Sequence, residues 1–140
     1  MTLKIILASH GELAKGMKQS VELIAGKQEN LEAFCAYTEN DYNLQLQVSS
    51  LMDREAGELI VITDIFGGSV NNEFMRYLRR GNLSLIAGMN MAIVIELLTK
   101  INSGGSIEEL IKEAIKTSKE SITNCNDLIG MGSSIIEDEF

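Results

Sequence analysis

Four short aliphatic segments alternate with longer amphipathic ones, and this alternation restricts the fold more than any other feature of the chain. The aliphatic segments cover residues 3–8, 31–37, 58–64 and 83–87, and each has the length and composition of a strand. Segment 58–64 is the clearest, because four large aliphatic residues follow one another there, as in strands buried on both faces. Strands that alternate with helices predict an α/β fold, here a single doubly wound domain with a mainly parallel four-stranded sheet in the order 2-1-3-4.

Apolar residues recur at helical spacing between these strands and after the last one. Ser106, followed three residues later by Glu109, fits a capping box, and Asn40 or Asp41 could cap the second helix. Gly81 is a plausible stop for the third helix. The predicted helices cover residues 13–24, 41–55, 70–78, 91–101 and 107–115.

The pattern weakens beyond residue 121. Residues 122–129 could form a short extra strand, and residues 131–140 have the composition of an acidic, solvated tail. A chain of 140 residues corresponds to one domain, which we expect to cover residues 1–130.

The net charge of −8 excludes some partners and favours others. Nucleic acids and anionic membranes reward clustered lysine and arginine, so we expect neither as a partner, whereas a protein with a basic surface would suit this chain. The two cysteines, Cys35 and Cys125, do not indicate a disulfide framework. The sequence has no apolar run of transmembrane length and no signal-peptide pattern, so we expect a cytoplasmic protein without direct membrane insertion.

Two reactive residues lie where predicted strands end. His10, the only histidine, closes the first strand, and Asp64 closes the third. Ligands of open α/β sheets bind at the carboxyl ends of the strands, and strands 1 and 3 are neighbours in the predicted order, so the two side chains can meet. A carboxylate that accepts one imidazole N–H fixes the tautomer and leaves the other ring nitrogen as a nucleophile. The sequence does not say which nitrogen that is.

A glycine-rich loop follows Asp64 and leads into a helix. Gly67 and Gly68 allow the backbone to approach an anion, the Ser69 hydroxyl adds a hydrogen-bond donor, and Gly11 is expected to leave space beside the imidazole. Together these residues predict a histidine that accepts and donates a phosphoryl group, with no metal and no cofactor.

Other chemistries fit the sequence less well. Histidine phosphatases carry arginine directly before the histidine, where this chain has Ser9, and receiver domains need acidic residues after the first strand. Metal-ligand spacing, a Walker A loop and a dinucleotide-binding fingerprint are all missing from the sequence.

Three stretches give the chain a resemblance to the IIA component of the mannose-family sugar phosphotransferase system. The first is the apolar strand that ends in His10 and Gly11, and the second is the loop 63–69, which is similar to the family's T/V-D-x-x-G-G-S pattern. The third is the segment 86–90, Ile-Ala-Gly-Met-Asn, followed by Glu96. The resemblance extends over nearly the whole chain through the last predicted helix.

The resemblance implies a phosphotransferase with a phosphohistidine intermediate. His10 would accept the phosphoryl group from the carrier protein HPr and pass it to a IIB component for sugar uptake. Asp64 would be its hydrogen-bonding partner, with Ser69 and the Gly67–Gly68 backbone at the phosphate. Family members form homodimers that exchange a C-terminal strand, a role that residues 122–129 could serve.

Departures from the family pattern leave two matters open. Val70 and Ala92 stand where proline is frequent, and Ile65 stands where a hydroxyl residue can follow the aspartate, so the sugar class is not defined. The same fold could also serve as a phosphorylation-dependent regulatory module or as the phosphoryl-donor subunit of a dihydroxyacetone kinase.

Overall fold

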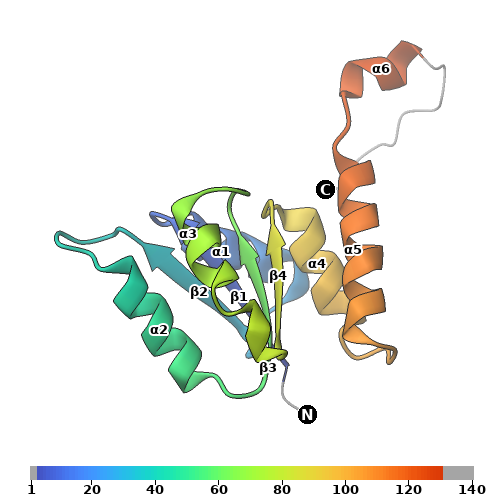
Figure 1. The fold of residues 1–140 in the computed structure, drawn as a ribbon. Coiled ribbons are helices and arrows are strands. Elements are labelled where there is room, and N and C mark those ends of the chain that lie inside the picture. The colour runs from blue at the N-terminus through green and yellow to red at the C-terminus, as the bar shows by residue number, and fades with distance from the viewer. Residues whose placement is uncertain (1–2, 131–140) are drawn as a thin grey trace.

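The protein is built around one parallel β-sheet, seen in a computed structural model that describes residues 3–130 (Figure 1). The strand order is β2-β1-β3-β4 and every neighbouring pair is parallel, which confirms the predicted fold class and sheet order. The strands are β1 (Leu3–His10), β2 (Leu31–Ala36), β3 (Glu58–Thr63) and β4 (Leu83–Ala87).

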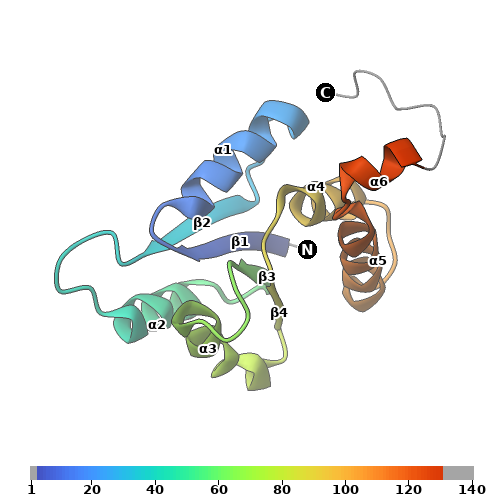
Figure 2. The same ribbon diagram turned by 90° about the horizontal axis from the view of Figure 1, so that it is seen from above.

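Helices cover both faces of the sheet (Figure 2). They are α1 (Leu13–Ala25), α2 (Leu44–Arg54), α3 (Ser69–Met75), α4 (Met91–Lys100), α5 (Ile107–Ser121) and α6 (Cys125–Gly130), with a short 3₁₀ turn η1 (Leu78–Arg80) after α3. Helices α1 and α4 lie on one face, with α5 packed against α4, and α2 and α3 lie on the other. No helix within residues 3–130 has the length and hydropathy needed to cross a membrane.

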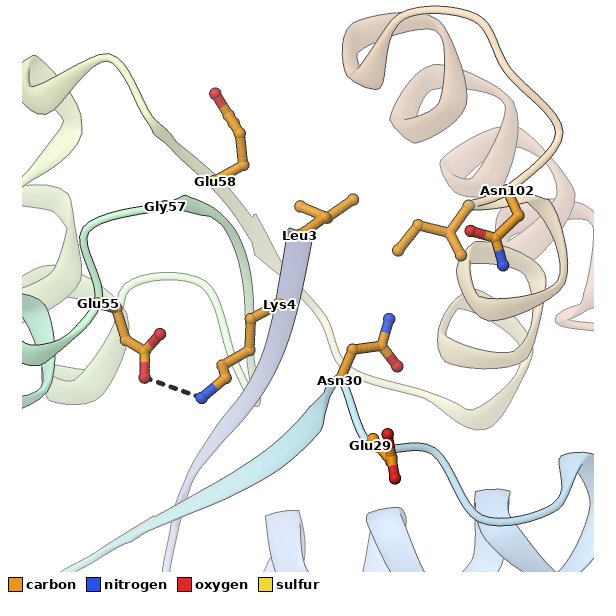
Figure 3. Close-up of a pocket in the computed structure, with 9 residues that line it drawn as sticks. Leu3, Lys4, Glu29, Asn30, Glu55, Gly57, Glu58 and Asn102 are labelled. Carbon is orange, nitrogen blue, oxygen red and sulfur yellow. Dashed lines mark hydrogen bonds and ion pairs between the residues drawn. The ribbon is translucent and has the colours of Figure 1, made fainter. Parts of the chain in front are cut away.

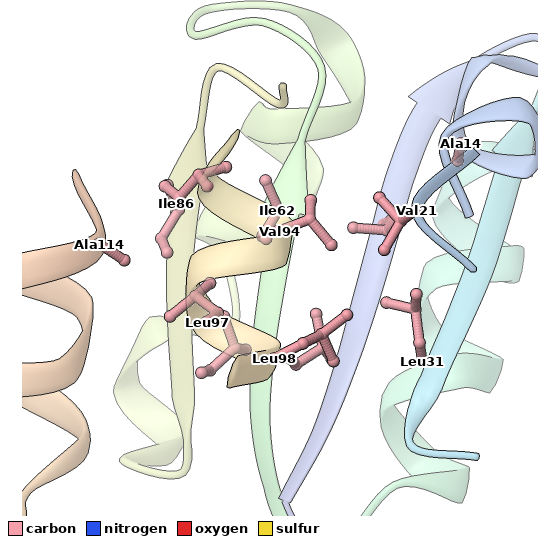
Figure 4. Close-up of a cluster of buried hydrophobic side chains, with 13 residues drawn as sticks. Ala14, Val21, Leu31, Ile62, Ile86, Val94, Leu97, Leu98 and Ala114 are labelled. Carbon is pink, nitrogen blue, oxygen red and sulfur yellow. The ribbon is translucent and has the colours of Figure 1, made fainter. Parts of the chain in front are cut away.

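Two hydrophobic clusters sandwich the sheet, because successive side chains of a strand point to opposite faces. In β3, Ile60 and Ile62 face the cluster under α1 and α4, while Leu59 and Val61 face the cluster under α2 and α3. All four are essentially inaccessible to solvent. Figure 4 shows the first cluster, where Val94 and Leu97 of α4 lie over Ile62 and Ile86. This two-sided burial explains why β3 has no polar alternation.

The helix ends show where the sequence pattern was imprecise. Helix α2 begins at Leu44 and is capped by the side chain of Asn43, rather than by Asn40 or Asp41. Asp41 instead adopts a left-handed backbone with φ of 56°. The cap at Ser106 is confirmed, since its hydroxyl accepts a hydrogen bond from the backbone N–H of Glu109.

The possible strand at residues 122–129 is a wrong prediction, because helix α6 occupies most of that segment. Asn124 starts the helix: its side-chain oxygen accepts from Asn126 N–H and its carbonyl oxygen accepts from Asp127 N–H. A strand needs a partner strand and usually a buried face, whereas Ile122 and Ile129 are largely exposed. The predicted acidic tail, residues 131–140, lies outside the described residues.

The amino ends of the strands carry a charged network. Lys4 Nζ lies 2.9 Å from a Glu55 carboxylate oxygen and 3.3 Å from one of Glu32, and Arg54 pairs with Glu32 at 2.8 Å. The hydrogen bond to Glu55 raises the pKa of Lys4 above its ordinary value. The network borders an open cavity of about 460 Å³ (Figure 3). It ties β1 to β2 and α2 at the end of the sheet away from His10.

We expect Phe74→Ala to lower the free energy of unfolding by about 3–5 kcal/mol, because Phe74 is fully buried and makes an edge contact with Phe34. The matched control is Phe66→Ala, whose ring is 78% exposed, so the change should stay within about 0.5 kcal/mol. Chemical denaturation of both variants measures the difference. Equal losses would contradict the assignment of Phe74 to the core.

Candidate functional site

The structure brings together the two residues that the sequence places at strand ends. His10 is the last residue of β1 and Asp64 directly follows β3, the parallel neighbour of β1. The Asp64 backbone N–H donates to the Ala8 carbonyl, which extends the pairing of the two strands by one residue. As a result, His10 Nδ1 lies 2.7 Å from Asp64 Oδ2, and the backbone N–H of His10 donates to the same oxygen at 2.8 Å.

Asp64 is held in its charged form. Burial raises the pKa of this carboxyl, but the hydrogen bonds from the His10 backbone and ring and from the Ile65 backbone N–H outweigh burial, so the net pKa lies below its ordinary value. An ionised carboxylate only accepts hydrogen bonds, so in the neutral imidazole Nδ1 carries the proton. Nε2 is then left with a free electron pair.

The two partners differ in their access to solvent. The side chain of His10 is 44% exposed, whereas that of Asp64 is only 10% exposed. The carboxylate is therefore largely shielded from solvent, whereas the ring is open to an incoming reactant. This arrangement can present Nε2 as a nucleophile while Asp64 stabilises the ring as it becomes positively charged.

Short polar contacts position the segments that carry the site. The buried Ser9 hydroxyl donates to the Gly11 carbonyl and accepts from the backbone N–H of Ala14, which fixes the connection from β1 to α1. The Thr63 hydroxyl donates to the Asn71 side-chain oxygen at 2.7 Å, which ties the end of β3 to α3. The start of α3 is therefore held beside the imidazole.

Ser69 and Tyr37 complete the surroundings of Nε2. Ser69 Oγ lies 3.2 Å from His10 Nε2, and the Tyr37 hydroxyl lies 2.9 Å from Ser69 Oγ. The Tyr37 ring also stacks on the imidazole, with ring centroids 5.6 Å apart. The sequence interpretation missed Tyr37 because it placed this residue inside the second strand. Its position directly after β2, next to β1 in the sheet, is the signal that could have found it.

Glycine is needed at different positions of the site for different structural reasons. Gly11 and Gly67 have φ of 60° and 84°, in the left-handed region that favours glycine. The expectation that Gly11 leaves space beside the imidazole is wrong, because a side chain there would meet nothing within 4 Å. Gly68 provides that space: a Cβ on it would lie 3.2 Å from His10 Cε1 and 2.9 Å from Ile65 Cγ2.

We expect Asp64→Asn to change how stability depends on pH. Because the folded protein lowers the pKa of Asp64, its charge stabilises the fold above the ordinary value of 3.8, and this contribution is lost as the pH falls through the folded pKa. The variant should lose on the order of 1–3 kcal/mol at neutral pH and show a shallower further loss in acid. Urea unfolding across a pH series measures both effects.

The control for that series is Asp53→Asn, which removes an exposed aspartate from α2. An Asp64→Asn variant with the same acid sensitivity as the wild type would show that the carboxylate is not stabilised by its contacts with His10.

Comparisons with known proteins extend over nearly the whole chain. Residues 4–115 match the family model described as PTS system fructose IIA component. The mannose-specific EIIAB component of Escherichia coli (strain K12) is 28% identical over 131 residues, which is 87% of this chain but 39% of that protein's length. The chain therefore spans about two-fifths of this relative.

Two further proteins match over nearly their full length. The sorbose-specific EIIA component of Lacticaseibacillus casei is 25% identical over 147 residues, covering 99% of this chain and 100% of that protein. A crystal structure from Klebsiella pneumoniae, assigned to a phosphoenolpyruvate-dependent sugar phosphotransferase system permease, is 47% identical with a TM-score of 0.89, covering 92% of this chain and 95% of its own. The chain belongs to the mannose family of IIA components of the sugar phosphotransferase system.

Proposed function

We propose that this protein is a cytoplasmic phosphocarrier that accepts a phosphoryl group from phospho-HPr on Nε2 of His10 and passes it to a IIB component. The observation that carries the proposal is the hydrogen bond from Nδ1 to Asp64, which leaves Nε2 as the ring nitrogen with a free electron pair. The family assignment supports phosphoryl transfer in general. The sequence did not distinguish the two ring nitrogens, and the hydrogen bond from Nδ1 to Asp64 favours Nε2 as the nucleophile.

The transfer needs no proton to leave His10. Nε2 attacks the phosphorus atom of phospho-HPr, the N–P bond of the donor breaks, and a new N–P bond forms on Nε2 as the ring becomes positively charged. Asp64 already accepts the Nδ1 proton and stabilises that charge. In the second step Nε2 is the leaving group, and the phosphoryl group moves to the IIB component.

We assign the phosphoryl oxygens to the loop that follows β3. The Ser69 hydroxyl is within 3.2 Å of Nε2, close enough to donate to an oxygen on a phosphorus atom bound there. Gly68 supports this assignment because its missing side chain keeps the space next to the ring open. Gly67 allows the left-handed turn that brings the loop backbone to that side of the ring.

The surface around His10 suits a protein donor better than a small molecule. Ile65 and Phe66 are 58% and 78% exposed beside the site, and the chain as a whole carries a net charge of −8. Exposed apolar residues with an acidic background complement a basic partner that also buries apolar surface. Sugar choice would then belong to the partners, since the relatives named above are described for mannose and sorbose.

We also propose a homodimer. Among the described residues, strand β4 forms one edge of the sheet without a further partner strand, and an apolar cavity of about 440 Å³ lies beside it, bordered by Ile86, Ile115 and Ile122. An unpaired edge next to apolar surface is a site where a second chain can add a strand. Because α6 occupies residues 125–130, the proposal of a dimer does not rest on an exchanged strand at residues 122–129.

We expect the wild type to receive a labelled phosphoryl group when it is incubated with phosphoenolpyruvate, enzyme I and HPr. His10→Ala should remain unlabelled. The chain contains a single histidine, so phosphorus and nitrogen NMR of the labelled protein should show one phosphohistidine, substituted at Nε2. Equal labelling of both proteins would refute the proposal. A signal from Nδ1 substitution would refute the assigned nitrogen.

Asp64→Asn should slow phosphoryl transfer by roughly two or more orders of magnitude, because an amide no longer fixes the Nδ1–H tautomer or stabilises the charged ring. Rapid-quench measurements with phospho-HPr give the rate, and Asp53→Asn is the control for removing a surface charge. A rate close to that of the wild type would remove Asp64 from the mechanism.

A further inference from the structure

Tyr37 is held against His10 although nothing in the hydrophobic core requires it there. Its side chain is part of neither buried cluster and the residue is 46% exposed. The ring contacts both the imidazole, 5.6 Å away and stacked, and the ring of Tyr42, 5.2 Å away and tilted. Tyr42 itself packs against the cluster under α2 and α3, so its contact links the Tyr37 ring to that cluster.

The backbone of Tyr37 is also unusual. Its φ of 62° lies in the left-handed region, which is unfavourable for a residue with a large side chain. Glycine or asparagine would adopt this conformation more easily, so the tyrosine side chain has to compensate through its contacts. Those contacts are the stack on His10, the hydrogen bond to Ser69 and the ring contact with Tyr42.

With the imidazole neutral, the hydrogen-bond donors and acceptors of this cluster follow from Asp64. Asp64 accepts, so His10 Nδ1 donates and Nε2 accepts. Ser69, 3.2 Å from Nε2, must then donate its single hydroxyl proton to that nitrogen. Ser69 Oγ therefore accepts from the Tyr37 hydroxyl, which is the donor at 2.9 Å. The four residues form one chain of hydrogen bonds that runs from Tyr37 to Asp64.

We propose that Tyr37 is a positioning residue that acts through Ser69, holding the serine proton toward Nε2 of His10 and, after transfer, toward the phosphoryl group. The proposal rests on the proposed function of His10 as phosphoryl acceptor. A hydroxyl that accepts one hydrogen bond becomes a stronger donor in the next, so the Tyr37 contact also strengthens the contact that Ser69 makes.

The fate of the Nε2 electron pair during transfer explains why a Ser69 hydroxyl oriented by Tyr37 is useful. When the Nε2 electron pair becomes the N–P bond, Nε2 no longer accepts a hydrogen bond, and the Ser69 O–H is released from it. A rotation about the Cβ–Oγ bond of Ser69 then directs the hydroxyl proton to a phosphoryl oxygen. Oγ stays in place and still accepts from Tyr37. No proton changes its residue in this step, so Tyr37 and Ser69 neither gain nor lose charge.

The stack on His10 adds a second effect. It covers one face of the imidazole and limits rotation of the ring about its bond to Cβ. The face of an aromatic ring also attracts a nearby positive charge, so the tyrosine favours the charged ring that forms on phosphorylation. Tyr37→Phe removes the hydroxyl and keeps this ring, which makes it the variant that isolates the effect on Ser69.

The experiment is a double-mutant cycle on the rate of transfer from phospho-HPr. Tyr37→Phe alone should slow phosphorylation of His10 roughly three- to tenfold, the effect of one hydrogen bond. In a Ser69→Ala background the same change should have almost no further effect, because the Ser69 hydroxyl that Tyr37 orients is then absent. Tyr77→Phe is the matched control, since that tyrosine packs against the cluster under α2 and α3 instead of the imidazole.

A second measurement does not depend on HPr. The ¹⁵N signal of His10 Nε2 in the unphosphorylated protein should move toward the value of an unbonded nitrogen in Tyr37→Phe, but not in Tyr77→Phe. Phosphoramidate, a small phosphoryl donor, provides a labelling rate without a protein partner. If the wild type accepts nothing from HPr, the proposed function fails, while the ¹⁵N shift still tests the hydrogen-bond chain.

Two results would overturn the role of Tyr37. One is an unchanged transfer rate and an unchanged Nε2 signal in Tyr37→Phe. The other is an equal slowing by Tyr37→Phe in the wild-type and Ser69→Ala backgrounds, which would mean that the tyrosine acts independently of the serine. Circular dichroism and the unfolding midpoint of each variant show whether the fold is retained.

Discussion

The hydrogen bond between His10 Nδ1 and Asp64 Oδ2 is the interaction on which the rest of the site depends. It decides which ring nitrogen holds the proton, and through that it decides the direction of every other hydrogen bond around the ring. It exists because β1 and β3 are adjacent and parallel, so that their carboxyl ends emerge side by side. The core that holds these strands together is therefore also what aligns the reactive groups.

The rigid and accessible parts of the site are clearly separated. Asp64 and the polar ties at Ser9 and Thr63 are shielded or buried, whereas His10 and Tyr37 are close to half exposed. The proposed exchange of a phosphoryl group with other proteins would need this division, because the nucleophile must be reachable while its orientation stays fixed. The charged network at the far end of the sheet takes no part in this geometry.

Much of the fold could be predicted because its signals are local. Segment 58–64 indicates a strand by itself, and the alternation of strands and helices leads to a doubly wound sheet with His10 and Asp64 at one edge. The prediction of an extra strand at residues 122–129 was wrong because it also used only the local pattern. A short, mixed segment pairs as a strand only if a neighbouring strand is available, and Asn124 starts a helix instead. Local pattern does not supply that information.

By itself, the sequence determined the order of the elements and singled out His10 and Asp64 as the candidate pair, because a single histidine and a strand-terminal aspartate leave little choice. Only the tertiary structure decided that Nδ1 faces Asp64 and Nε2 is the unprotonated nitrogen of the neutral ring, that Gly68 rather than Gly11 makes room for the ring, and that Tyr37 lies against it. These facts depend on distances between segments far apart in the chain. Such distances are set when the two hydrophobic clusters pack against the sheet, and no spacing along the sequence contains them.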